Sequence, residues 1–139
     1  MLGAMLDHLR HIRQRRILSH DLAVGRHGED LAHRYLRRHG YTIVARNYRL
    51  AAGDAEADLI AHEGGDIVIV EVKTRTTAAY GPPDRAIGPE KLRHLMRVVR
   101  EYARRTDTPL ERVRIDVVTV VLSSPPEIAL QKRVVPLSG

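Results

Sequence analysis

The segment DIVIVEVKTR, residues 66–75, constrains the fold more than any other stretch of this chain. Its first half is a continuous run of isoleucine and valine, which is typical of a buried strand. Strand side chains alternate between two faces, so Ile69, Glu71 and Lys73 point to the same side. The sequence therefore predicts a core strand that ends with an acid and a base beside its apolar residues.

A second strand precedes this one, and a tight turn joins the two. Residues 56–62 and 67–74 are strand candidates, and the Gly64-Gly65 pair between them is typical of a hairpin turn. A slip of one residue would send one carboxylate to the other face of the hairpin. With the turn centred on the two glycines, the facing pairs are Ile60 with Ile69, Asp58 with Glu71, and Glu56 with Lys73.

The predicted opposition of Asp58 and Glu71 needs a chemical explanation. Facing residues have Cβ atoms roughly 5 Å apart, and like charges there destabilise a sheet. One carboxyl is protonated, or Lys73 neutralises the pair, or a hard divalent cation such as Mg²⁺ binds between the two. A metal would polarise a phosphate and lower the pKa of a bound water, and Lys73 would orient that water or offset developing charge. The alternative is an ordinary surface cluster at a frayed strand end.

The charges are segregated along the chain. Lysine and arginine outnumber aspartate and glutamate by 23 to 17, yet residues 51–74 hold six acids and a single base, Lys73. A basic surface suits a polyanion such as nucleic acid. Acids inside such a surface would repel the ligand unless they held a cation, so the segregation favours a metal site within a nucleic-acid interface.

The remaining elements give an α/β fold of order α-α-β-β-β-α-β-β, a mixed sheet flanked by helices. Three consecutive strands predict an antiparallel meander, and the helix that follows is long enough to cross over to a parallel strand. Residues 1–20 form an amphipathic helical extension, and residues 21–139 a single domain. The expected helices are 2–17, 22–39 and 89–105, and the expected strands are 41–50, 56–62, 67–74, 112–122 and 128–135.

Asp58 followed by Glu71-Val72-Lys73 resembles the motif of the PD-(D/E)xK nuclease superfamily, which shares the restriction-endonuclease-like core. A sharper resemblance, over roughly residues 25–122, is to the bacterial YraN-like family, which is described as similar to archaeal Holliday-junction resolvases. The chain has Ala55-Glu56-Ala57-Asp58 where that family usually has Gly-Glu-Ile-Asp. The matching segments are Gly28-Glu29 opening a helix with Ala32 and Tyr35-Leu36, then Gly40-Tyr41, Ala45-Arg46-Asn47-Tyr48, Asp58-Leu59-Ile60, Val70-Glu71-Val72-Lys73-Thr74-Arg75, Lys91, and Arg114-Ile115-Asp116-Val117-Val118.

The resemblance implies a role for each matching residue. Asp58 and Glu71 are expected to be Mg²⁺ or Mn²⁺ ligands, helped by the Val72 carbonyl, and Lys73 the catalytic lysine. Glu29 is expected to be an additional catalytic acid; without the resemblance, it would be explained as an acid in a first helical turn. Asp116 is expected to be structural. The residues expected to meet DNA phosphates are Arg75 and Lys91, together with Arg93 and Arg97 from an arginine stripe on the helix 89–105.

Other classes of function have less support. The eight histidines complete no ligand set, and no phosphate-binding glycine loop is present. No apolar run reaches the ~18 residues of a membrane span, and the absence of cysteine fits a cytoplasmic protein. The expectation is therefore a magnesium-dependent nuclease that cuts branched or otherwise structured DNA. Two alternatives are a non-catalytic DNA-binding module on the same fold, and a protein-interaction or assembly factor that uses the N-terminal amphipathic helix to dimerise or dock. A homodimer is compatible with the nuclease as well.

Overall fold

The computed structural model describes residues 2–76 and 87–135, with side chains described from residue 20 onward. Within these residues a five-stranded sheet lies between two helices, which confirms the predicted α/β class. The elements, in chain order, are α1 (Leu2–Arg38), β1 (Thr42–Arg49), β2 (Glu56–Glu63), β3 (Asp66–Arg75), α2 (Pro89–Arg105), a 3₁₀ turn at Leu110–Arg112, β4 (Val113–Val121) and β5 (Glu127–Gln131).

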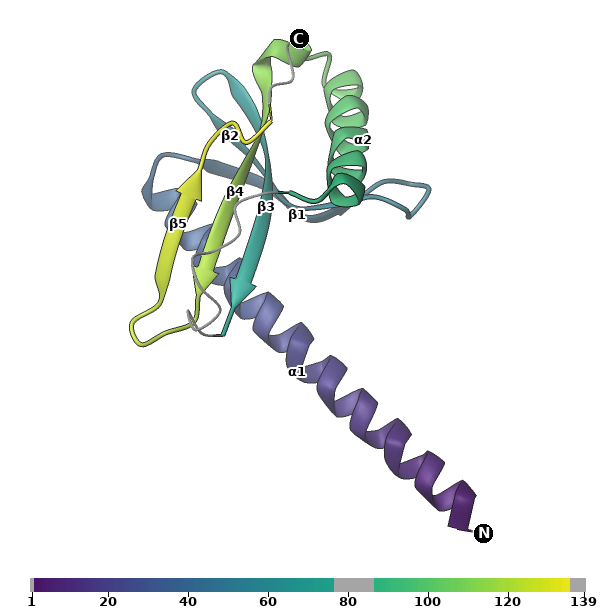
Figure 1. Ribbon diagram of the computed structural model, residues 1–139. Helices are drawn as coiled ribbons and strands as arrows, with labels where there is room; N and C mark the ends of the chain where they lie inside the picture. Colours follow the sequence, from purple (N-terminus) through teal and green to yellow (C-terminus); the bar gives the residue numbers. More distant parts are fainter. Residues whose placement is uncertain (1, 77–86, 136–139) are drawn as a thin grey trace.

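The sheet has the order β1-β2-β3-β4-β5 (Figure 1). The first three strands form the predicted antiparallel meander, and β4 pairs with β3 in parallel after the crossover through α2. β5 then returns antiparallel on the edge and ends at Gln131, four residues before the predicted limit. The long apolar strands β3 and β4 lie at the centre, because a strand covered on both faces needs apolar side chains on both.

Each helix covers one face of the sheet. Ile60, Ile69 and Ile115 pack with Leu95 and Val99 of α2. On the other face, α1 contributes two fully buried side chains, Ala32 and Leu36, to a cluster with residues of β2, β3 and β4. The two helices are held in place by these two apolar layers, because each helix buries a wide apolar stripe against the sheet.

The predicted hairpin register is correct for the residue pairs of the β2–β3 ladder, whereas the predicted pairs Asp58–Glu71 and Glu56–Lys73 lie beyond that ladder. Ile60 pairs with Ile69, and Gly64 has the positive φ of 60° that a tight turn requires. The β2–β3 ladder runs from Glu63–Asp66 beside the turn to Leu59–Val70. Asp58 and Glu71 are the next residues in this register, so they lie at the open end of the hairpin.

The predicted division of the N-terminal region into two helices is wrong. α1 is one helix of 37 residues, and its first half extends away from the sheet (Figure 1). The cause is the junction at residues 18–21, Leu-Ser-His-Asp, which contains neither glycine nor proline to interrupt helical hydrogen bonding. Gly28 consequently lies inside the helix and does not open it, in contrast to the expectation from the resemblance. Among the described residues, no helix is long and apolar enough to cross a membrane.

A charged network lies at the turn end of the hairpin. Arg114 of β4 is 5% exposed and donates hydrogen bonds to Asp116, Glu63 and Asp66. Tyr41 completes the network by donating its hydroxyl to Asp116 at 2.9 Å. We call these five residues the turn-end network. Asp116 is fully buried and also accepts the amide of Arg133, which confirms its predicted structural role.

Candidate functional site

Two carboxylates mark the open end of the hairpin. The side chain of Asp58 on β2 contacts the backbone of β3. Its Oδ2 accepts a hydrogen bond from the N–H of Val72 at 2.8 Å. The negative charge of Asp58 also raises the pKa of Glu71, which places the two carboxylates within electrostatic reach. We call Asp58 and Glu71 the acidic pair. The Asp58–Val72 hydrogen bond and the effect of Asp58 on Glu71 place the two carboxylates near each other, although the ladder of paired residues ends before them, at Leu59–Val70.

Glu71 has the most strongly raised pKa among the acids of the site. Burial, followed by the charge of Asp58, raises its pKa to about 7, although Lys91 and Lys73 act in the opposite direction. Its side chain is 13% exposed, and Oε2 is buried without a hydrogen-bond partner among the described residues. The Lys91 ammonium lies 3.3 Å from this oxygen and forms an ion pair with it, which lowers the pKa of Glu71 against the larger effect of burial.

Opposing effects also act on the pKa of Asp58. Burial raises its pKa, while the Val72 amide and the charge of Lys91 lower it without cancelling the effect. The acidic pair therefore has too little positive charge around it to keep both carboxyls in their ordinary titration range.

Glu29 reaches the same region from the opposite face of the sheet. Burial and then the charge of Asp58 raise its pKa, while Asn47 and Arg46 lower it. Its position depends on Gly28, because a Cβ at that residue would lie 1.9 Å from Oγ1 of Thr74. The absence of a side chain at Gly28 therefore allows α1 to pack closely against Thr74 of β3. Since Glu29 lies deep inside α1, the helix N-terminus does not explain its presence.

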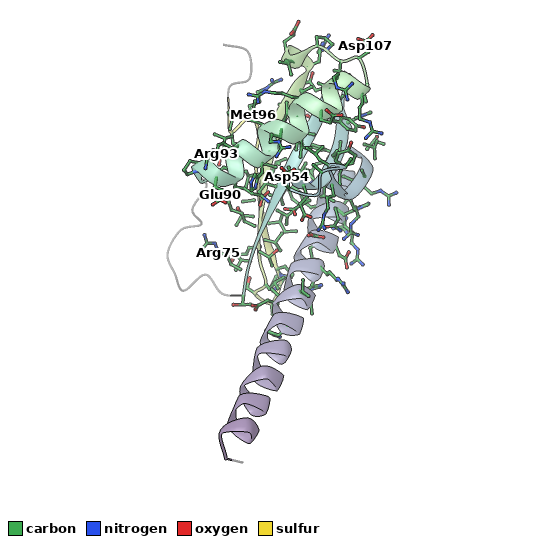
Figure 2. The ribbon with its side chains drawn as sticks, turned by 90° about the vertical axis from the view of Figure 1, so that its right-hand side faces the viewer. Asp54, Arg75, Glu90, Arg93, Met96 and Asp107 are labelled. Atoms are coloured by element: carbon green, nitrogen blue, oxygen red, sulfur yellow. The ribbon has the colours of Figure 1, made fainter. Side chains whose placement is uncertain are left out.

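The predicted basic residues lie in different environments. Lys73 follows Glu71 on β3 and lowers its pKa. Arg75 ends β3 half-buried, with an Nε that has no hydrogen-bond partner among the described residues. Arg97 pairs with Asp54, and Arg93 is exposed on α2. In Figure 2, Arg93 and Glu90 lie at the end of α2 nearer to Arg75, and Asp107 lies beyond the opposite end.

The contact between Lys91 and Glu71 is a feature that sequence reasoning missed. Lys91 was assigned to DNA phosphates, whereas its ammonium here lies beside the acidic pair. Its position near the start of α2 was predictable, but the contact depends on how the crossover seats that helix on the sheet. Val72 also differs in part, since the contact it makes with Asp58 is through its N–H.

The donor set of the acidic pair suits a hard divalent cation. Carboxylate oxygens are the ligands that Mg²⁺ takes in proteins, often with only one or two carboxylates and several waters. The buried Oε2 of Glu71, which has the Lys91 ammonium 3.3 Å away and no other partner among the described residues, could serve as one ligand. Within the described residues, however, no group of three or more His, Asp or Glu side chains is arranged to hold a metal ion. Any metal here would rest on two carboxylates, with water or substrate completing its shell.

Comparisons with known proteins identify the family. Residues 28–120 match the model of the uncharacterised protein family UPF0102. The chain is 45% identical to a UPF0102 protein of Solibacter usitatus over 128 residues, which covers 92% of this chain and 95% of that protein. It is 46% identical to a UPF0102 protein of Koribacter versatilis, over 85% of this chain and 82% of that protein. The UPF0102 protein of Rhodococcus opacus is 44% identical over 79% of this chain and 92% of its own length. With these matches across most of its length, the chain belongs to the uncharacterised protein family UPF0102.

Proposed function

We propose that this protein is a magnesium-dependent endonuclease that hydrolyses backbone phosphodiesters of structured DNA, in the manner of a Holliday-junction resolvase. The observation that carries the proposal is the acidic pair, in which burial and Asp58 raise the pKa of Glu71 to about 7 and in which Lys91 is the only partner of the buried Oε2 among the described residues. Perturbed carboxyls held together by a fold are typical of functional sites, because such an arrangement destabilises a protein that does not use it.

The residues of the site have complementary roles in this reaction. Asp58 and Glu71 would hold the ion, with the Val72 amide fixing the orientation of the Asp58 carboxylate. A bound Mg²⁺ would supply an electrophile for the phosphate oxygens and a water of lowered pKa. Lys73, next to Glu71, would orient the attacking water and offset charge that develops on the phosphate. Glu29 would accept a hydrogen bond from a water at the opposite side of the site.

The surface around the site supports a nucleic-acid substrate. The chain carries a formal net charge of +6, and Arg93, Arg97, Arg100 and Arg104 are exposed along α2. Arginine contacts to phosphates give affinity without reading sequence. The chain contains no Phe or Trp, so aromatic platforms for stacking single-stranded bases are scarce. Both features favour recognition of DNA shape, and the preference for branched DNA is drawn from the resemblance of the motif.

A cleavage assay tests the proposal. Wild-type protein is incubated with a four-way junction, a flap and a linear duplex, each in Mg²⁺, Mn²⁺ or EDTA. We expect metal-dependent cutting of the branched substrates, and a loss of at least 10²-fold in Asp58→Asn and Glu71→Gln, because each removes a charged ligand.

The matched control is Glu101→Gln, which removes an exposed carboxylate of α2 that pairs with Arg104. This variant should cut like the wild type. Equal cutting by the wild type and by the Asp58→Asn, Glu71→Gln double variant would refute the proposal, because the activity would then not come from this site.

A non-catalytic DNA-binding module is the second candidate. The observation that favours it is the ion pair between Lys91 and Glu71, which partly neutralises the acidic pair without a metal. A module of this kind would bind four-way junctions in a salt-sensitive manner in EDTA and would cut none of the three substrates in either metal.

A further inference from the structure

Lys91 makes an unusual contact with the acidic pair. Its ammonium lies 3.3 Å from Oε2 of Glu71, and that oxygen is buried without a hydrogen bond from any described residue. The Glu71 side chain is 13% exposed, whereas that of Lys91 is 38% exposed. One partner is therefore fixed inside the protein, and the other enters from the solvent on a flexible four-carbon stem.

The charge of Lys91 acts on both carboxylates. It lowers the pKa of Asp58 as well as that of Glu71, in each case against the larger effect of burial. A single ammonium thus serves two acids at the open end of the hairpin. A cation held by the acidic pair would have the same electrostatic role.

We propose that Lys91 is an exchangeable counter-ion of the acidic pair, which neutralises it in the metal-free protein and which a divalent cation displaces from Glu71. The inference rests on the metal site of the proposed function. A divalent cation and an ammonium group against the same buried oxygen repel each other strongly, because little water lies between them to screen the charges. The metal affinity of the site is therefore set in part by competition with Lys91.

Displacement gives Lys91 a second position. Its stem can swing outward into the solvent, because the Lys91 side chain is already 38% exposed. The same event that admits the ion thus adds a positive charge to the surface that faces the substrate. The ammonium can then contact a phosphate, as a flexible point charge commonly does.

The chain contains a second lysine–glutamate pair that serves as a control. Lys132 lies 2.9 Å and 3.2 Å from the two carboxylate oxygens of Glu63, which belongs to the turn-end network. Glu63 also accepts a hydrogen bond from Arg114, so this carboxylate has two cationic donors. It lies outside the candidate site.

The decisive measurement is the affinity for Mn²⁺ by electron paramagnetic resonance on the full chain. The proteins are the wild type, Lys91→Met, Lys132→Met and Glu71→Gln. Lys91→Met keeps an apolar stem and removes the charge, so it should bind Mn²⁺ about tenfold more tightly, equivalent to one pKa unit of interaction. Lys132→Met should bind like the wild type, and Glu71→Gln should bind far more weakly.

Nuclear magnetic resonance of the lysine side chains gives an independent readout. The chain has only three lysines, at positions 73, 91 and 132, so their ammonium signals are readily assigned by substitution. On titration with Mg²⁺, the Lys91 signal should move toward that of a solvated lysine, while the Lys132 signal should stay in place.

The outcomes separate this inference from the proposed function. Equal or weaker Mn²⁺ binding in Lys91→Met overturns the counter-ion role, even if the wild type binds metal and cuts DNA. Unchanged binding in Glu71→Gln overturns the metal site itself. Binding in Lys91→Met but not in the wild type would support the competition in its strongest form, and no binding in either protein would overturn both ideas.

Discussion

The two ends of the β2–β3 hairpin both bury charged side chains, and they balance those charges differently. At the turn end, Arg114 donates to three carboxylates and Asp116 accepts further hydrogen bonds from Tyr41 and the Arg133 amide. At the open end, Glu71 keeps a buried oxygen without a hydrogen bond from any described residue. Buried charge is tolerated where hydrogen bonds satisfy it, and it is costly elsewhere. The turn end therefore stabilises the fold, and under the proposed function the open end would hold a metal ion.

The largest expected effect is at the turn end. Arg114→Met should lower the free energy of unfolding by about 3–5 kcal/mol, because it leaves Asp116 and its neighbouring acids without their common partner. Urea denaturation followed by circular dichroism measures this. The matched control is Arg112→Met, since Arg112 is 60% exposed and lies 3.6 Å from Asp66; it should cost under about 0.5 kcal/mol. Equal effects for both arginines would break the comparison.

A smaller effect is expected from metal at the open end. Mg²⁺ at about 100 times its dissociation constant should stabilise the wild type by about 2.7 kcal/mol, because it binds the folded state alone. Thermal denaturation with and without Mg²⁺ measures this as a rise in melting temperature. Glu71→Gln should show no such rise, whereas Glu63→Gln, which alters the turn end, should show the full rise. A rise that survives Glu71→Gln would place the ion elsewhere.

The open end should also become more stable when its charge is removed. In EDTA above pH 7, Glu71→Gln should raise the free energy of unfolding by about 1–2 kcal/mol, because the raised pKa of Glu71 shows that its ionised form is disfavoured in the fold. Chemical denaturation of the variant beside the wild type tests this. A destabilised variant would mean that the ion pair with Lys91 outweighs the burial and repulsion of the carboxylate.

The smallest effect is a difference in pH dependence. The folded pKa of Glu71 is raised from 4.5 to about 7, so the folded state binds more protons in this window and stability falls as pH rises through it. The pKa of Glu63 is lowered by Lys132 and Arg114 despite burial, so its contribution is present above 4.5 and lost as pH falls. The stabilisation by Glu71→Gln should therefore grow from pH 4.5 to 7. The destabilisation by Glu63→Gln should shrink below pH 4.5. Melting curves of both variants and of the wild type across pH 4–8 test this. The prediction is contradicted if, as pH rises, the stability of both variants relative to the wild type changes in the same direction.

The hairpin and its acidic pair were predictable from sequence because their information is local. Gly64-Gly65 fixes the turn, and a register set by a turn decides which side chains face each other up to Leu59 and Val70, next to Asp58 and Glu71. Strand alternation and one proline-initiated helix were enough to predict the meander and the crossover. These parts depend on residues close together in the chain.

The missing parts depend on contacts between distant elements. The sequence contains no feature that assigns Lys91 to Glu71, because that contact follows from the seating of α2 on the sheet. The partners of Arg114 lie up to 73 residues away, so only the assembled sheet brings them together. The break predicted in α1 was wrong for a different reason. The junction at residues 18–21 contains no glycine or proline, so the helix continues through it.

The parallel pairing of β3 with β4 has a consequence for the order of folding. Asp58 contacts Val72 across 14 residues, whereas Arg114 contacts Asp66 across 48 residues. Short loops close at lower entropic cost, so the hairpin can form well before β4 joins it. We therefore expect the repulsion within the acidic pair to be present early, before the late closure of the turn-end network makes the structure cooperative. The residues kept for a ligand would then slow the first step of folding, and the turn-end residues would mainly govern how slowly the finished protein unfolds.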